Sequence, residues 1–135
     1  MPESPFESSR APGAATTILV VDDEATVRLV VRRMLADGGY DAFEAPSGEA
    51  ALGLLEEDAN RFGFVITDVV LPGQDGCQRG RRIRARWPAT PVLYASAYPP
   101  EELFAQGICT DDLPFLRKPF TADELIRRVR ELRAA

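Results

Sequence analysis

Five polar residues of this sequence close or directly follow short apolar runs, and together they could assemble around a phosphoryl group. They are Asp22, Asp23, Asp68, Ser96 and Lys118. Carboxylates that crowd one site repel each other unless they are protonated or neutralised by a cation. A hard divalent ion with oxygen ligands, most naturally Mg²⁺ holding several waters, is the economical solution. In such a site a free carboxylate is the nucleophile, and the cations neutralise the oxygens of the transferring group.

Each of these residues, taken singly, also has a simpler structural explanation. Asp22 or Asp23 could cap the helix that follows, and Asp68 could begin a turn in the Pro-Gly loop behind it. Ser96 could be a loop hydroxyl, and Lys118 a solvated charge. Their joint occurrence at the ends of apolar runs favours a shared site over these separate roles.

Lys118 is the only lysine in the chain, so fifteen of the 16 basic residues are arginine. Arginine suits solvated faces and bidentate contacts, whereas a compact ammonium on a flexible stem fits a crowded pocket that already holds a metal and carboxylates. The sequence therefore predicts that Lys118 serves the site.

Five short apolar runs alternate with five amphipathic segments along the chain. This alternation predicts an α/β fold with a doubly wound, five-stranded parallel sheet. In such sheets sites form outside the carboxyl ends of the strands, where the five polar residues stand. Ser47 is a predicted N-cap, and Thr121 with Glu124 a predicted capping box. We predict strands at 16–21, 40–45, 62–67, 91–96 and 113–117, helices at 25–37, 47–57, 77–87, 99–107 and 121–132, and a loop at 68–76.

The length of 135 residues predicts one folded domain, which we place at 17–135 behind a disordered leader or linker at 1–16. The net charge of -5 argues against direct nucleic-acid binding. No apolar run approaches the roughly 20 residues that span a bilayer, and residues 1–16 lack the basic-then-apolar layout expected of a signal peptide. Cys77 and Cys109 fit no metal or disulfide framework, so we expect a cytoplasmic protein. The arginines of 77–87 are interpreted as a solvated basic face, although they could dock an acidic partner.

Four motifs carry a family resemblance: "ILVVDDE", "VITDVVLPGQDG", "VLYASA" and "FLRKPF", in this order within residues 17–134. With them the chain resembles the receiver domain of two-component response regulators. Its downstream pattern is similar to receivers attached to hybrid sensor histidine kinases. The resemblance implies the flavodoxin-like (βα)5 receiver fold and a phospho-acceptor switch in a phosphorelay, which assists its own phosphorylation and dephosphorylation but is not a conventional enzyme.

The resemblance also implies an acceptor and a Mg²⁺ site. Asp68 matches the residue that takes the phosphoryl group from a partner's phosphohistidine. Asp23 and Asp68 match carboxylates that bind Mg²⁺ directly, Asp22 matches one that acts through water, and the backbone carbonyl of Val70 matches the remaining protein ligand.

Further residues match the phosphate-binding and switching positions of the family. Lys118 matches the lysine that contacts the phosphoryl group, and the bond to its following proline is usually cis. Ser96 matches the switch hydroxyl that turns toward the phosphoryl oxygen. Ala97 and Val69 are expected to contact the phosphate. Phe115 stands where the family often places a switching aromatic residue, and simple packing explains it equally well.

The implied partners are a sensor histidine kinase or a phosphotransfer protein, and a downstream protein or a second copy bound through the surface from the fourth to the fifth helix. Two alternatives stay open. A phosphorylation-independent interaction module would keep the fold without the chemistry. A metal-dependent phosphohydrolase is disfavoured because Val70 stands where a second acid would be needed. Since neither Val70 nor Tyr98 can orient an attacking water, slow intrinsic dephosphorylation is expected.

Overall fold

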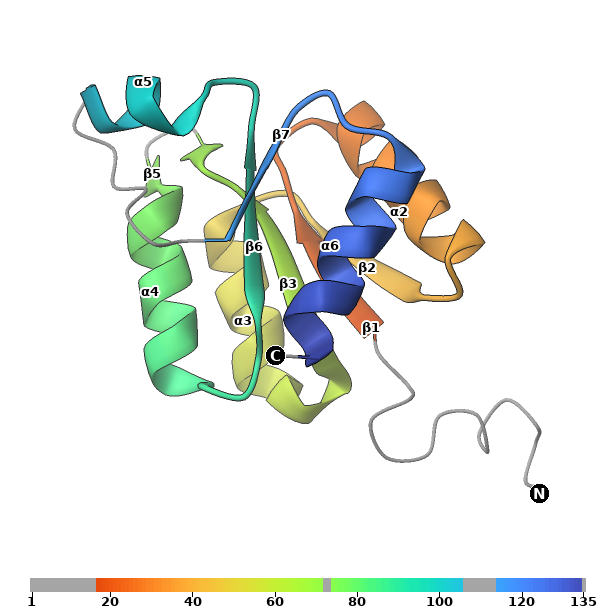
Figure 1. Cartoon of the computed structure of the whole chain (residues 1–135). Helices are drawn as coiled ribbons and strands as arrows, with labels where there is room; N and C mark the ends of the chain where they lie inside the picture. Colours follow the sequence, from red (N-terminus) through yellow and green to blue (C-terminus); the bar gives the residue numbers. More distant parts are fainter. Residues whose placement is uncertain (1–16, 72–73, 106–113, 135) are drawn as a thin grey trace.

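The computed structural model describes residues 17–71, 74–105 and 114–134, so the predicted leader at 1–16 lies outside the described residues (Figure 1). Five parallel strands form one sheet in the order β2-β1-β3-β6-β7. The first strand in the chain thus lies inside the sheet, with later strands added on both sides. The strands are β1 (Thr17–Val21), β2 (Asp41–Ala45), β3 (Phe62–Asp68), β6 (Val92–Ser96) and β7 (Phe115–Arg117).

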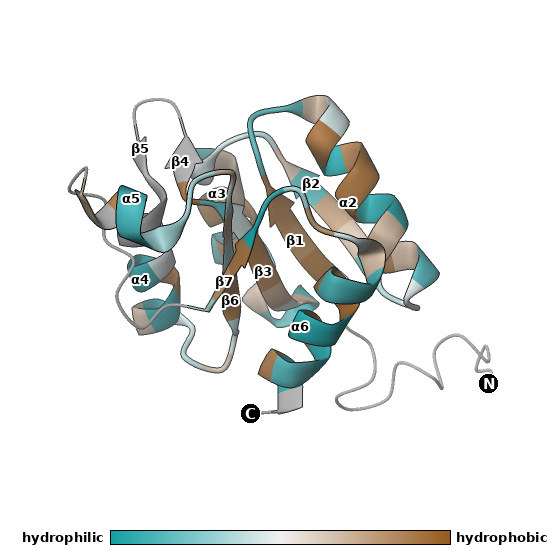
Figure 2. Ribbon diagram, turned by 45° about the horizontal axis from the view of Figure 1, so that its top comes forward, coloured by the Kyte–Doolittle hydropathy of each residue, from teal (hydrophilic) through white to brown (hydrophobic). Residues whose placement is uncertain are grey.

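Helices cover both faces of this sheet, because alternate residues of each strand point to opposite sides. In β1, Leu19 and Val21 belong to one buried cluster and Ile18 and Val20 to the other. The first cluster includes side chains of α3 (Gly48–Asp58) and α4 (Gly76–Arg86). The second includes side chains of α2 (Ala25–Asp37) and α6 (Ala122–Ala134). The apolar strands lie between these layers in Figure 2. A further helix, α5 (Pro100–Ala105), follows β6.

The predicted fold class is therefore confirmed, and so are two predicted helix caps. The Ser47 hydroxyl accepts a hydrogen bond from the Ala50 N–H at 3.1 Å. The Glu124 N–H donates to the Thr121 hydroxyl at 3.1 Å, and the Thr121 N–H donates to the Glu124 carboxylate at 2.8 Å. Such caps fix where α3 and α6 begin and hence where the connections before them end.

The prediction that residues 68–76 form a loop is partly wrong. This segment contains a short antiparallel ladder of β4 (Val70–Leu71) with β5 (Gln74–Asp75), and α4 begins at its last residue. A 3₁₀ turn, η1 (Ala59–Arg61), also precedes β3 without having been predicted. Elements of two or three residues are too short to produce a hydrophobic period, which is why the sequence pattern does not reveal them.

The basic face predicted for the third helix agrees with the exposure of its arginines. Arg81, Arg82, Arg84 and Arg86 are exposed, and Arg86 pairs with Glu56 at 2.7 Å. The side chains of Arg79 and Cys77, like all of Cys109, lie outside the described part of the chain. Within that part, no helix has the length and apolarity needed to cross a membrane.

Candidate functional site

Three carboxylates meet at the carboxyl edge of the sheet. β1 and β3 are neighbours and Val21 is paired with Thr67, so the next residues, Asp22 and Asp68, follow side by side. Asp22, Asp23 and Asp68 each offer a carboxylate oxygen within 4.8 Å of the others. Asp22 is buried, Asp68 is half-buried and Asp23 is exposed. This set of hard oxygen donors, open on one side, fits Mg²⁺ with retained waters.

The Lys118 ammonium closes the buried side of this cluster. Its Nζ donates to Asp22 Oδ2 and to Asp68 Oδ2, each at 2.8 Å, and its side chain is 19% exposed. Burial lowers the pKa of Lys118, but the hydrogen bonds to Asp22 and Asp68 outweigh this and raise the pKa above its ordinary value of 10.5. The ammonium therefore stays charged at neutral pH and neutralises part of the carboxylate charge.

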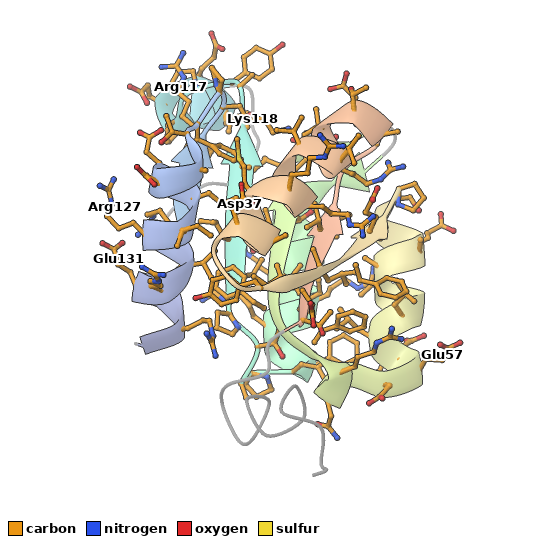
Figure 3. All side chains as sticks on the ribbon, turned by 90° about the vertical axis from the view of Figure 1, so that its right-hand side faces the viewer. Asp37, Glu57, Arg117, Lys118, Arg127 and Glu131 are labelled. Carbon is orange, nitrogen blue, oxygen red and sulfur yellow. The ribbon has the colours of Figure 1, made fainter. Side chains whose placement is uncertain are left out.

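The backbone around Lys118 places it at the site. The Lys118 N–H donates to the Ser96 carbonyl at 2.8 Å, which ties the end of β7 to the end of β6. The peptide bond between Lys118 and Pro119 is cis, as the resemblance implies. Figure 3 shows Lys118 beside Arg117 at the end of β7. The sole lysine thus reaches back toward β1 and β3 from the edge strand.

Ser96 is the last residue of β6, which lies between β3, where Asp68 ends the strand, and β7, which Lys118 directly follows. Ala95 is paired with Asp68, and Ser96 with Arg117. Ser96 is only 1% exposed, and its hydroxyl oxygen accepts a hydrogen bond from the Tyr98 N–H at 3.1 Å. The hydroxyl therefore lies at the same sheet edge as the acidic cluster and is hydrogen-bonded to the connection between β6 and α5.

The other residues predicted for the site lie near this edge, but their positions do not test the roles predicted for them. Ala97 is exposed at the start of the connection to α5. The Val69 N–H donates to the Ala95 carbonyl at 3.0 Å, and Val70 pairs with Asp75 in the β4–β5 ladder. Phe115 is half-buried against the cluster that contains Tyr94. The phosphate contacts of Ala97 and Val69, the metal contact of the Val70 carbonyl and the switching of Phe115 stay predictions.

Two features of the site were not predicted. The first is Arg28, whose Nη1 donates to the Asp22 carbonyl at 2.7 Å. No signal in the sequence marks this contact, since it depends on the rotamer of one arginine among fifteen. The second is an apolar cavity of about 420 Å³ that borders Lys118. It is lined from α2 and from the β7–α6 connection by Val27, Val30, Val31, Met34, Pro119 and Phe120.

Comparison with known proteins agrees with this fold. The family model of the response regulator receiver domain matches residues 18–130. The sensor kinase CckA of Brucella abortus (strain 2308) is 34% identical over 131 residues, which cover 96% of this chain and 14% of that protein. The transcriptional regulatory protein ResD of Bacillus subtilis (strain 168) is 36% identical over 119 residues, covering 87% of this chain and 48% of that protein.

Solved structures give the same result. A response regulator receiver protein from Sinorhizobium medicae WSM419 superposes with a TM-score of 0.77 at 34% identity, covering 90% of this chain and 96% of that chain. The receiver domain of the hybrid histidine kinase CckA gives a TM-score of 0.70 at 34% identity, covering 86% and 97%.

The fold is that of a receiver domain, a signalling module of two-component systems. The chain belongs to the response regulator receiver family, and the receiver of a hybrid kinase is among its relatives. It spans 14% of the CckA sequence and 48% of the ResD sequence.

Proposed function

We propose that Asp68 accepts a phosphoryl group from the phosphohistidine of a partner histidine kinase or phosphotransfer protein. The observation that carries this proposal is the Lys118 ammonium bonded to both Asp22 and Asp68, beside three carboxylates whose oxygens lie within 4.8 Å of one another. Asp68 is half-buried, so a donor can reach it from solvent.

In the proposed reaction a carboxylate oxygen of Asp68 attacks the phosphorus atom. A new O–P bond forms, the P–N bond to the donor imidazole breaks, and its electron pair returns to the ring nitrogen. Before transfer the Lys118 ammonium contacts an oxygen of Asp68. After transfer it would contact an oxygen of the phosphoryl group instead. Ala97 and Val69 are proposed to supply further contacts to the phosphate.

Asp22, Asp23, Asp68 and the Val70 carbonyl are the residues that would hold Mg²⁺. When bound, the ion supplies positive charge that offsets the carboxylates and the developing charge on the phosphoryl oxygens. The Lys118 ammonium already places one cation among these carboxylates, which supports a site that holds negative groups together.

We further propose that Ser96 and Phe115 carry the switch. In the unphosphorylated chain the Ser96 hydroxyl oxygen accepts a hydrogen bond from the Tyr98 N–H. A phosphoryl group on Asp68 would offer an oxygen to which the Ser96 O–H could donate, and turning toward it would change the contact with Tyr98. Reorienting this hydroxyl would alter the connection to α5, and Phe115, paired with Tyr94 in the sheet, would repack. The surface formed by α5, β7 and α6 would then bind a downstream protein or a second copy.

The phosphodonor is proposed to dock on the apolar surface beside Lys118. Leu29 and Val30 on α2 are 46% and 50% exposed, and Val30 also lines the cavity next to Lys118. A helix that packs there would lie close enough to Asp68 to deliver an imidazole. We place this exchange in the cytoplasm, with residues 17–135 as the receiver and 1–16 as a leader or linker.

Beryllofluoride or acetyl phosphate with Mg²⁺ tests the chemistry. The proposal expects a Mg²⁺-dependent adduct in the wild type, measured by mass spectrometry or ¹⁹F NMR. A chain that forms no adduct and binds no Mg²⁺ would instead be the phosphorylation-independent interaction module. Turnover of an external phosphomonoester would indicate a phosphohydrolase.

The phosphoprotein is expected to be long-lived, and a lifetime of only seconds would contradict this.

The docking surface is tested by comparing two phosphodonors. Val30→Glu should slow transfer from a phosphorylated histidine kinase about tenfold or more, the loss expected when a buried apolar contact becomes a charge. Its reaction with acetyl phosphate should stay at the wild-type rate. Ala36→Glu, an exposed position on the same helix, is the matched control. Equal rates from the kinase for both variants would place the donor elsewhere.

A further inference from the structure

The Arg28 side chain links three elements next to the acidic edge. It projects from the first turns of α2 and is 15% exposed. Its Nε donates to Glu44 Oε1 on β2 at 2.9 Å, and its Nη1 donates to the Asp22 carbonyl at 2.7 Å. One guanidinium thus joins α2, β2 and the connection that carries two of the three clustered carboxylates.

This contact completes the hydrogen bonding of Asp22. The Asp22 N–H donates to the Ala45 carbonyl at 3.2 Å. Its Oδ1 accepts from the Glu24 N–H at 2.9 Å, and its Oδ2 accepts from Lys118. Arg28 donates to the carbonyl oxygen of Asp22, a residue that is only 3% exposed, and so provides this buried acceptor with a hydrogen bond.

The carbonyl that Arg28 holds belongs to the peptide unit between Asp22 and Asp23. That unit is planar, so fixing its oxygen also fixes the direction in which the chain enters Asp23. Among the described residues, none holds the exposed Asp23 carboxylate by a hydrogen bond. Its approach to Asp22 and Asp68 therefore depends on the backbone on either side. The Asp22 carboxylate holds the Glu24 N–H that follows Asp23, and Arg28 holds the carbonyl that precedes it.

We propose that Arg28 is a positioning residue of the metal site: it orients the peptide unit before Asp23, so that the Asp23 carboxylate faces those of Asp22 and Asp68. The inference rests on the proposed Mg²⁺-binding function. Arg28 touches neither the phosphoryl group nor the cation, and acts only through the backbone.

Arg32 provides a matched control within the same helix. It lies one turn further along α2 and donates to Glu44 Oε2 at 2.8 Å, so both arginines share one carboxylate. Within the described part of the chain Arg32 makes no hydrogen bond with Asp22, and its side chain is 49% exposed. Arg28→Gln and Arg32→Gln remove the same charge and the same Glu44 partnership, but only the first releases the Asp22 carbonyl.

Electrostatics and positioning predict opposite signs for this substitution. Removing a cation near three carboxylates should by Coulomb's law alone strengthen the binding of Mg²⁺. Loss of a backbone anchor should weaken it, because Asp23 no longer starts in the binding geometry. The direction of the change in Mg²⁺ affinity therefore separates the two effects.

The experiment measures the Mg²⁺ affinity of the full chain by isothermal titration calorimetry. It also measures amide hydrogen exchange in Mg²⁺-free buffer at Asp22 and Glu24, whose N–H groups are hydrogen-bonded. Arg28→Gln should weaken Mg²⁺ binding on the order of tenfold, the loss typical of groups that orient metal ligands, and should speed exchange at both amides. Arg32→Gln should match the wild type within about twofold. Arg28→Lys keeps the charge but loses the planar fork whose separate nitrogens reach Glu44 and the carbonyl, so it should recover Mg²⁺ affinity only in part.

Several results would overturn the inference. Equal or tighter Mg²⁺ binding by Arg28→Gln would show that Arg28 acts only through its charge, as would full rescue by Arg28→Lys. Equal weakening by Arg28→Gln and Arg32→Gln would indicate a general loss of stability. If Arg28→Gln does not fold, the charge-preserving Arg28→Lys still tests the anchor: weaker Mg²⁺ binding with faster exchange at Asp22 and Glu24 supports positioning, and wild-type values in both overturn it. A wild-type chain that binds no Mg²⁺ would instead refute the proposed function itself.

Discussion

The connection from β1 to α2 and the connection from β6 to α5 leave the same edge of the sheet, but they are held by different numbers of hydrogen bonds. In the first, Asp22 is bonded through its N–H, its carbonyl and both carboxylate oxygens. In the second, the Ser96 carbonyl accepts from the Lys118 N–H at 2.8 Å, but the contacts beyond it are longer. The Ser96 hydroxyl accepts from the Tyr98 N–H at 3.1 Å, and the Ala97 carbonyl accepts from Arg117 at 3.4 Å.

This difference matches the two tasks of a phosphorylation switch. A metal and acceptor site works best when its carboxylates are already in place, because ordering them would otherwise cost free energy during binding. A readout element must be able to change its contacts when the phosphoryl group arrives. The acidic side of the edge is thus preorganised, and the hydroxyl side has the weaker contacts that a switch requires.

The largest expected effect comes from removing the acceptor on the preorganised side. Asp68→Asn should abolish the beryllofluoride adduct, because the amide is not a nucleophile and binds the fluoride complex poorly. The fold should be kept, since one repelling carboxylate is lost from a crowded cluster. ¹⁹F NMR measures the adduct, and circular dichroism the fold. Asp37→Asn, at the end of α2, is the control that should behave as the wild type (Figure 3). An undiminished adduct in Asp68→Asn would place the acceptor elsewhere.

The next effect concerns the cation that holds the preorganised side together. Lys118→Met leaves the buried Asp22 carboxylate and that of Asp68 without the ammonium, which should lower the free energy of unfolding by about 3 kcal/mol. Added Mg²⁺ should restore part of this loss, because it binds the folded state. Urea denaturation with and without Mg²⁺ measures both changes.

Lys118→Arg is the charge-preserving companion of this variant. It should keep the fold and the Mg²⁺ affinity, yet impair phosphorylation or the downstream response, since the planar guanidinium does not fit the place of a compact ammonium. Wild-type behaviour in both respects would mean that the uniqueness of this lysine carries no function.

A smaller effect is expected on the switching side. Ser96→Ala removes the acceptor of the Tyr98 N–H and should lower stability by only about 1 kcal/mol. Its Mg²⁺-dependent adduct should still form, but the NMR shifts of the Ala97 and Tyr98 amides on adduct formation should shrink. Ser96→Thr keeps the hydroxyl and should retain these shifts. Full shifts in Ser96→Ala would contradict the proposed role of the hydroxyl.

Local patterns were sufficient to predict much of the fold and the members of the acidic edge. The apolar strands and the caps at Ser47 and Thr121 depend on neighbours within a few residues, and parallel strands then bring their carboxyl ends together. Up to 96 positions of sequence separate Asp22, Asp68 and Lys118, but the order of parallel strands alone brings them to one edge.

The sequence could not predict contacts that depend on the rotamer of one side chain. Arg28 reaches the Asp22 carbonyl only because β2 places Glu44 where it can hold the guanidinium, and no periodicity encodes that geometry. The β4–β5 ladder escaped prediction for the opposite reason: its strands are two residues long and carry no pattern. The preorganisation of the acidic side is therefore a tertiary property.

The smallest effect is the pH dependence of the Glu44 pairs that support the preorganised side. Hydrogen bonds from Arg32 and then Arg28 lower the pKa of Glu44 below its ordinary value of 4.5. Stability from these pairs is then fully present above pH 4.5 and is lost as the pH falls through the lower pKa of the folded state. Wild type and Glu44→Gln should differ by about 0.5 kcal/mol near neutral pH.

The comparison of these two proteins isolates Glu44 from the other carboxyl groups, which titrate in both. Urea denaturation from pH 7 down to pH 3 should therefore show the stability gap closing below pH 4.5, and high salt should shrink it at pH 7 because Arg32 is half-exposed. A gap that stays constant with pH would mean that Glu44 contributes through packing, and that the support of the β1–α2 connection is independent of its charge.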